Sequence, residues 1–250
     1  MRFSEDLDFV TSLPENTIEK ILTLTFKKMN NVCVAQFGTG SLEQKIKKGR
    51  PDAVKVFYIY RPEKQRERIA VKVEFEKLKK GCLPAYQHVV LRDVPCVSSM
   101  LSTGVLIMPY SSSIILVETG EEILSDKIRA IYERKYIKGR DIYDIWWLSV
   151  QLKIKIDWHH VKKKMSMYTY KFTPARKAGF FQDKNNQQEI INALQTDLPR
   201  FIPENIYSVY QASQFEFFFK ALNSVTLNLL NQGMRYYLES INESYEEIKT

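Results

Sequence analysis

The strongest strand pattern along the chain lies in its first third. Residues 53–60 are rich in Val, Phe, Ile and Tyr, and residues 69–75 alternate strictly between apolar and polar side chains. The stretch between them is polar and contains Pro62, so the two segments predict a β-hairpin with a long exposed connection. Within the second arm, Glu74 falls on the polar face.

Shorter apolar segments complete the pattern of the first half. Apolar residues at helical spacing run from Ile18 to Phe26 and predict a helix that ends near the Asn30–Asn31 pair, while residues 38–49 resemble a loop with a basic edge. Further strands are predicted at residues 32–37, 87–91, 105–107 and 114–117. We therefore expect a mixed sheet with one or two helices over residues 1–117.

The first ten residues, MRFSEDLDFV, also predict a strand. Leu7 and Phe9 fall on one face, and Ser4, Asp6 and Asp8 fall on the other. Alternate side chains on one strand face lie about 6.6 Å apart. Two carboxylates placed in this way can share a divalent cation or a pair of cations. A solvated edge strand is the alternative interpretation of an isolated D-x-D.

From residue 118 onward the apolar residues follow helical spacing. The segment EEILSDKIRAIYERKY predicts a helix, Gly139 interrupts it, and RDIYDIWWLSVQL continues as a second helix. Asp157 is placed to cap a short basic helix through Lys164. Further helices are predicted at residues 187–194, 215–230 and 234–248. The fold class is therefore α+β, with a mixed-sheet lobe over residues 1–117 and a helical lobe over residues 118–250.

Composition and charge narrow the classes of function. The 250-residue chain carries a net charge of +8, which favours a polyanionic partner such as nucleic acid or a triphosphate. Its three cysteines and three histidines show no C-x-x-C and no ligand spacing, which argues against a zinc site or a disulfide framework. No membrane-length apolar run and no signal-peptide layout is present, so we expect a cytoplasmic protein without a membrane partner.

Three blocks, RFSEDLDF, EEILSDKIRAIYER and RDIYDIWWL, follow one another between residue 2 and about residue 148. In order and spacing they resemble the AbiEii/AbiGii nucleotidyltransferase toxins, the toxin half of abortive-infection toxin–antitoxin pairs. The resemblance implies a polymerase-β-like nucleotidyltransferase fold, Mg²⁺ or Mn²⁺ as cofactor and an NTP as substrate. It also implies a toxin that transfers a nucleotide to RNA, tRNA most plausibly, or to protein, with a cognate antitoxin as a further partner.

The first block and the hairpin supply the predicted metal ligands. Nucleotidyl transfer needs metal ions that neutralise the triphosphate and activate the attacking hydroxyl. Asp6 and Asp8 are the candidate ligands, and Glu74 is the candidate third carboxylate because its strand could lie beside the first. A solvated strand carboxylate is the alternative for Glu74. Ser4, on the face of the aspartates, is a predicted nucleotide-binding residue.

The second and third blocks supply the remaining predicted site residues. Lys127, one helical turn from an isoleucine on either side, could contact phosphate or extend to solvent, and the family resemblance favours phosphate. Arg134 shares its helix face two turns on and could bind phosphate or the aspartates of the third block. Arg140 is a further predicted nucleotide-binding residue. Asp141 and Asp144 lie on one face of the next helix. They could hold Lys127 or Arg134 in place by ion pairing, or act as a general base. We expect one aspartate to be catalytic and the other supportive.

A basic segment after residue 158 is the predicted RNA-binding surface. Basic and aromatic residues alternate in HHVKKKMSMYTYKFTPARKAGFF, a mixture that suits phosphate contacts and base stacking. The predicted contacts are Lys162, Lys163, Lys164, Lys171 and Arg176. An exposed helix and loop with partly buried aromatics is the alternative.

One departure from the family pattern concerns the triphosphate-binding element. Family members carry a Gly-Ser or Gly-Gly-Thr about ten residues before the D-x-D, whereas this sequence starts five residues before Asp6. Either the true start lies upstream, or this is a shortened member without activity. A catalytically inactive RNA- or partner-binding module and a transferase for a small molecule such as an aminoglycoside are the alternative functions.

Overall fold

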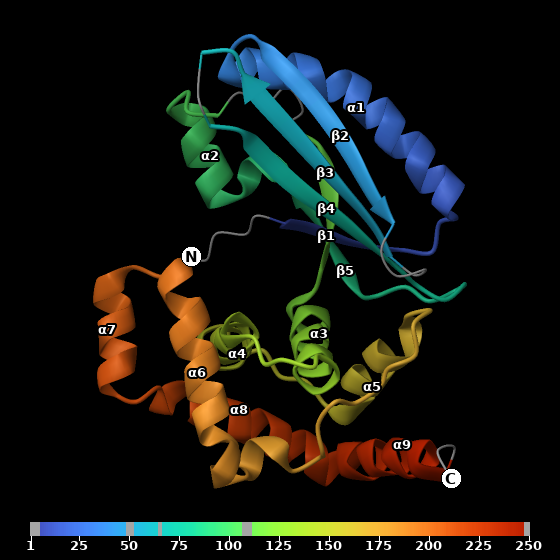
Figure 1. Cartoon of the computed structure of the whole chain (residues 1–250), viewed down its shortest axis with the longest axis vertical. Coiled ribbons are helices and arrows are strands. Elements are labelled where there is room, and N and C mark those ends of the chain that lie inside the picture. The colour runs from blue at the N-terminus through green and yellow to red at the C-terminus, as the bar shows by residue number, and fades with distance from the viewer. Residues whose placement is uncertain (1–5, 49–52, 65–66, 107–111, 248–250) are drawn as a thin grey trace. The chain divides into compact units, whose positions relative to one another are not determined.

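The structure is a computed structural model that describes residues 6–48, 53–64, 67–106 and 112–247 (Figure 1). As far as its residues are described, the chain forms two compact units. The N-terminal unit contains Ser4–Val117 and Tyr168–Tyr170, and the C-terminal unit contains Glu118–Met167 and Lys171–Thr250. Each unit has its own hydrophobic core.

A four-stranded mixed sheet forms the N-terminal unit's framework, with the strand order β1-β4-β3-β2. Strand β1 pairs in parallel with β4, whereas the β2–β3 and β3–β4 pairs are antiparallel. The strands are β1 (Asp6–Thr11), β2 (Gly40–Lys48), β3 (Ala53–Pro62) and β4 (Ile69–Lys77). The predicted hairpin is thus confirmed as β3 and β4, and β1 lies beside β4 as expected for Glu74.

One face of this sheet is apolar and is covered by helix α1 (Glu15–Phe37) (Figure 1). Ile18 and Leu22 of the helix are buried against Val56 and Val73 of the sheet. Because side chains alternate along a strand, the same register turns the neighbouring polar residues to the opposite face. That polar face carries both aspartates of the first block and Glu74.

Two sequence predictions between residues 32 and 49 are wrong. Residues 32–37 continue helix α1 rather than forming a strand, because α1 runs unbroken through the Asn30–Asn31 pair and ends at Gly38, whose φ is +80°. Residues 40–48 form β2 rather than a loop. The sequence of β2 contains few apolar residues, so it lacks the alternating pattern that predicts a strand. Backbone hydrogen bonds to β3, rather than a buried apolar face, hold it in the sheet.

The remaining strands form a separate two-stranded sheet. Strand β5 (Tyr86–Val90) pairs with β6 (Ile114–Glu118), close to the two predicted segments. Between them lies the short helix α2 (Pro95–Ser102). The strand predicted at residues 105–107 is not formed at Val105 or Leu106, and Ile107 lies outside the described residues.

Helices build the described part of the C-terminal unit, as the apolar spacing predicted. They are α3 (Gly120–Glu133), α4 (Gly139–Trp146), α5 (Trp158–Met167), α6 (Gln187–Asp197), α7 (Glu204–Ala212), α8 (Glu216–Leu229) and α9 (Arg235–Glu247). Helix α4 packs against α3, α6 and α8. The α+β class, with a mixed sheet followed by a helical unit, is therefore confirmed.

The helix boundaries of this unit follow local signals that the sequence carries. Gly139 begins α4, and the Asp157 side chain accepts a hydrogen bond from the His160 amide at the start of α5, as expected of a cap. Helix α7 was not predicted as a separate element; none of its residues is buried, and Tyr207 and Tyr210 pack partly buried against the core. Among the described residues, no helix is both long and apolar enough to cross a membrane.

Candidate active site

Charged side chains gather on the polar face of the N-terminal sheet. The pairing register places Asp6 opposite Lys72 and Asp8 opposite Glu74 on the neighbouring strand, with Lys55 opposite Glu74 on the other side. The Lys72 Nζ lies 2.7 Å from Asp6 Oδ2 and 3.3 Å from Glu74 Oε2. Lys55 Nζ lies 2.8 Å from the second oxygen of Glu74. Two carboxylates therefore converge on one ammonium group.

This arrangement stabilises the charged forms of its members. Burial alone would raise the pKa of Glu74, but Lys55 and Lys72 outweigh it and hold that pKa below its usual range. Burial likewise opposes the charge of Lys72, yet Asp6 and Glu74 hold its pKa above the usual range. Ionised carboxylates that face one cation are the donor type that Mg²⁺ and Mn²⁺ prefer.

Whether this polar face can bind a metal ion depends on Lys72, which contacts two of the predicted ligands. Asp6 and Glu74 already share a cationic partner, so their oxygens can approach one positive centre. Asp8 is exposed and lies directly opposite Glu74 on the neighbouring strand. Among the described residues, however, no group of three His, Cys, Asp or Glu side chains is arranged to hold a metal. In this geometry the ammonium of Lys72 takes the position between two of the three predicted ligands.

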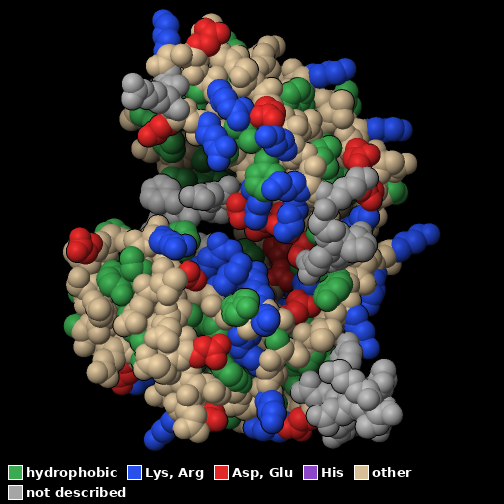
Figure 2. Space-filling model, in the orientation of Figure 1, with side chains coloured by type: hydrophobic (Ala, Val, Ile, Leu, Met, Phe, Trp, Pro, Cys, Tyr) green, Lys and Arg blue, Asp and Glu red, His purple; other side chains and the backbone are tan. Residues whose placement is uncertain are grey.

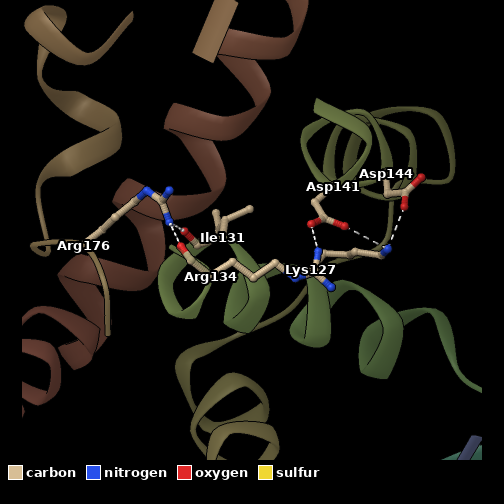
Figure 3. Close-up of polar contacts among 6 residues, drawn as sticks. All are labelled: Lys127, Ile131, Arg134, Asp141, Asp144 and Arg176. Atoms are coloured by element: carbon tan, nitrogen blue, oxygen red, sulfur yellow. Dashed lines mark hydrogen bonds and ion pairs between the residues drawn. The ribbon is translucent and has the colours of Figure 1, made fainter. Parts of the chain in front are cut away.

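A second charged cluster joins helices α3 and α4 of the C-terminal unit (Figure 3). Lys127 Nζ lies 3.3 Å from Asp141 Oδ1 and 2.8 Å from Asp144 Oδ2. Arg134, at the end of α3, pairs with the second oxygen of Asp141. The structure thus brings together the predicted Lys127, Arg134, Asp141 and Asp144, which we call the α3–α4 ion network.

The two aspartates of this network differ in their surroundings. The Asp141 side chain is 2% exposed and the Asp144 side chain 19%. Burial would raise the pKa of Asp141, but Lys127 and Arg134 outweigh it and hold that pKa below its usual range. Asp141 also lies in the first turn of α4, where the helix dipole favours a negative charge. Asp141 is therefore a buried anion that fixes two cations.

Arg140 and Ser4 are the other predicted nucleotide-binding residues. Arg140 is half-buried in the first turn of α4. Ser4 lies outside the described residues.

The predicted RNA-binding set needs correction at two positions. Lys162, Lys163 and Lys171 are exposed, but Lys164 and Arg176 are buried. The Lys164 Nζ lies 2.8–3.1 Å from carboxylate oxygens of three acidic residues on or beside α3: Glu118, Glu122 and Asp126. Lys164 is fully buried, so it cannot contact phosphate from this position, and only part of the basic segment is available to RNA.

Arg176 is the second correction. Its side chain donates hydrogen bonds to the backbone carbonyl oxygens of Ile131, at 2.8 Å, and Arg134 (Figure 3). It donates a third to the carbonyl oxygen of Lys135 at 3.2 Å. A buried guanidinium that satisfies three carbonyl groups is a structural residue, and the prediction of RNA contact is wrong for it.

Sequence reasoning missed Lys55 and Lys72 as partners of the carboxylates. The signal was present, because a lysine alternates with Glu74 on the same strand face, but Lys55 joins the cluster only once the β3–β4 register is known. Lys and Arg side chains are otherwise spread over both units on the face shown in Figure 2, with Asp and Glu between them.

Comparison with known families decides the identity of the chain. A family model described as "Nucleotidyl transferase AbiEii toxin, Type IV TA system" matches residues 1–221. The chain belongs to the AbiEii nucleotidyltransferase toxin family. All three blocks that carried the resemblance, and both charged clusters described above, lie inside the matched region of this AbiEii family member.

Two solved structures resemble this AbiEii chain. The first is JHP933 from Helicobacter pylori, with a TM-score of 0.44 and 13% identity over 100% of this chain and 83% of that one. The second is a candidate nucleotidyltransferase from H. pylori, with a TM-score of 0.43 and 16% identity over 89% of this chain and 81% of that one. Among curated protein sequences, none matches the AbiEii chain.

Proposed function

We propose that this AbiEii family member is a metal-dependent nucleotidyltransferase that moves a nucleotide from an NTP to RNA, with tRNA as the favoured acceptor, and acts as a toxin. The observation that supports this function best is the α3–α4 ion network. Its members come from the second and third blocks of the family resemblance, and they hold two cations, Lys127 and Arg134, around one buried carboxylate. Two fixed cations suit a polyphosphate substrate.

In this reaction the acceptor hydroxyl oxygen forms a bond to the α-phosphorus while the bond to the pyrophosphate leaving group breaks. Asp6, Asp8 and Glu74 would hold Mg²⁺ or Mn²⁺, which when bound neutralises the triphosphate and favours ionisation of the attacking hydroxyl. Lys127 and Arg134 would bind phosphate oxygens.

The two aspartates of α4 take different parts in this proposal. Asp141 positions both cations, because it is buried and its two oxygens are both engaged. Asp144 contacts Lys127 and its side chain is 19% exposed, so it is the better candidate to accept the hydroxyl proton. This assigns the catalytic role to Asp144 and the supportive role to Asp141.

RNA as the acceptor is supported by charge and by the exposed part of the basic segment. The net charge of +8 favours a polyanion, and Lys162, Lys163 and Lys171 remain exposed. Tyr170 is also exposed and could stack on a base. A cognate antitoxin is the further partner that membership of a toxin–antitoxin family suggests.

The test is a transfer assay with purified protein, Mg²⁺ or Mn²⁺, labelled NTPs and total tRNA. We expect incorporation by the wild type and its loss in Asp8→Ala and in Lys127→Ala. Asp8 is exposed on its strand, so its variant should melt like the wild type. Ile128→Ala is the contrasting variant: it removes a fully buried side chain and should cost about 2–5 kcal/mol of stability while the remaining folded protein stays active.

Two results would contradict the enzyme proposal. Full activity in both polar variants would place the site elsewhere, and an absence of incorporation by the wild type under every metal and NTP condition would remove the transferase. The second candidate is a catalytically inactive RNA-binding module, which the ammonium of Lys72 between Asp6 and Glu74 favours. It predicts tRNA binding without incorporation. Labelled protein acceptors and aminoglycosides in parallel reactions separate the other acceptor classes.

A further inference from the structure

The turn between α3 and α4 displays an aromatic side chain beside the ion network. Tyr136 is 72% exposed, although tyrosine usually buries most of its ring. The Lys135 Nζ lies 5.5 Å from the centroid of the Tyr136 ring. Arg134, two residues earlier, reaches Asp141 of the network. One short turn therefore combines an exposed ring, an adjacent ammonium and a cation of the candidate active site.

This turn is held rigidly by a buried side chain. Arg176, which is 6% exposed, donates hydrogen bonds to the carbonyl oxygens of Ile131 and Arg134 (Figure 3). It donates another to the carbonyl oxygen of Lys135, so the backbone is held up to the residue before Tyr136. The Ala175 amide donates a further hydrogen bond, 2.8 Å long, to the carbonyl oxygen of Tyr132.

The backbone after Tyr136 is held as well. Gly139 begins α4 and lies so close to α6 that a Cβ at this position would be 2.3 Å from the Ala193 carbonyl oxygen. The exposure of Tyr136 is therefore not the result of a loose loop. A side chain presented from a backbone that is already held in place avoids the entropy cost of ordering a loop on binding.

We propose that Tyr136 stacks on a nucleobase in a single-stranded stretch of the RNA acceptor, with Lys135 on a neighbouring phosphate. Every nucleobase has a π face, so stacking on tyrosine combined with contacts from lysine to phosphate binds single strands with little sequence preference. This inference rests on the proposed function, because it takes RNA as the acceptor and the α3–α4 ion network as part of its site.

A single exposed aromatic residue is ordinary on protein surfaces, so the chain's own counter-example matters. Tyr236, on α9 of the same unit, is 80% exposed. It does not lie on a turn held by a buried arginine, and none of its sequence neighbours belongs to the ion network. Tyr236→Ala is therefore a matched control: it removes the same ring from a comparable degree of exposure.

The test measures binding without turnover. A short labelled single-stranded RNA is titrated in the absence of NTP and metal, and its fluorescence anisotropy gives the dissociation constant. We expect Tyr136→Ala to weaken binding roughly 5- to 100-fold. Tyr136→Phe should retain wild-type binding because it keeps the ring, and Tyr236→Ala should bind like the wild type. Thermal melting should not distinguish the alanine variants from the wild type, because both side chains are exposed.

Three results would overturn this inference. The first is an equal effect of Tyr136→Ala and Tyr236→Ala. The second is an equal effect of Tyr136→Ala on an abasic oligomer of the same length, which would exclude stacking on a base. The third is weaker binding of a fluorescent NTP with unchanged RNA binding, which would assign the base to the nucleotide substrate. Because no nucleotide is transferred, a failure of the proposed catalysis would appear only in the transfer assay and stays distinguishable.

Discussion

Replacing Lys164 by methionine should destabilise the C-terminal unit strongly. Lys164 is fully buried, and its ammonium contacts carboxylates of Glu118, Glu122 and Asp126 at 2.8, 3.1 and 3.0 Å. Methionine keeps most of the side-chain volume but removes the charge. It would remove the ammonium that the three carboxylates share and leave them close to one another in buried or partly buried positions, with Arg129 still 3.9 Å from Asp126.

The magnitude follows from the cost of an uncompensated charge. Removing one partner of a buried ion pair typically costs about 3–5 kcal/mol, whereas an exposed pair contributes about 0–1 kcal/mol. We therefore expect Lys164→Met to lose about 3–5 kcal/mol near neutral pH. Lys163→Met is the matched control, because Lys163 is the neighbouring residue on the same helix but is exposed. This substitution should change stability by less than about 1 kcal/mol.

The loss should depend on pH in a defined direction. Burial, with Asp126 and Glu122, outweighs Lys164 and raises the pKa of Glu118 above its usual 4.5. A carboxyl whose pKa is raised by folding favours the folded state more as the pH falls through that pKa. Without Lys164 the pKa of Glu118 should rise further, so the deficit of the variant should narrow between neutral pH and about pH 5.

Tryptophan fluorescence is a selective assay for this unit. All three tryptophans of the chain, Trp146, Trp147 and Trp158, lie within it, so denaturant melts followed by their emission report on its unfolding. The reasoning is refuted if Lys164→Met melts like Lys163→Met at pH 7.5. A deficit that stays constant between pH 7.5 and pH 5 would show that the lost interaction is packing of the aliphatic stem rather than charge.

Two further predictions concern the charged clusters. Lys72→Met should tighten Mn²⁺ binding roughly fivefold, measured by electron paramagnetic resonance, because it removes the competing ammonium between Asp6 and Glu74. Lys47→Met is the control, since Lys47 lies on the same sheet face but outside these contacts. Weaker Mn²⁺ binding by Lys72→Met would contradict a metal site here. Asp141→Asn should cost about 3–5 kcal/mol of stability at pH 7. It should also remove the contribution of Asp141 to acid unfolding, because a carboxyl with a depressed pKa stabilises the fold above its usual 3.8 and loses that stabilisation as the pH falls through its pKa in the folded protein. An unchanged acid profile in denaturant melts would show that the buried network does not stabilise the fold.

Much of the fold could be predicted because apolar periodicity reports burial directly. The hairpin of β3 and β4 alternates with period two, and α3 places Leu124, Ile128 and Ile131 on one buried stripe. Segment 32–37 failed because a short apolar run fits a strand and a helix equally well, and only the length of α1 decides between them. Strand β2 failed because its pairing lies in the backbone, which leaves little trace in side-chain hydrophobicity.

Among the candidate site residues, the sequence was informative where helical spacing alone fixed a geometry. Lys127 and Arg134 share a face two turns apart, and both meet Asp141 in the structure. The run of three lysines at 162–164 was misleading. A lysine is expected to be exposed unless acidic side chains beside it compensate its charge in the interior, as they do for Lys164. Lys164 follows Val161 by three residues and precedes Met165, which places it on the apolar side of α5. Its acidic partners lie about forty residues away in sequence, where no local pattern could reveal them.

Helix α3 is held between two charge networks of opposite design. Along one side its acidic residues Glu122 and Asp126 surround a lysine of α5, and along another its cations Lys127 and Arg134 surround an aspartate of α4. Between them, Ile128 and Tyr132 are fully buried in the core. Apolar packing alone would tolerate small rotations of α3, whereas each network is satisfied in one orientation only. The buried Lys164 and the α3–α4 ion network thus serve one end: they fix the direction in which α3 presents Lys127 and Arg134, the two cations that the proposed reaction needs.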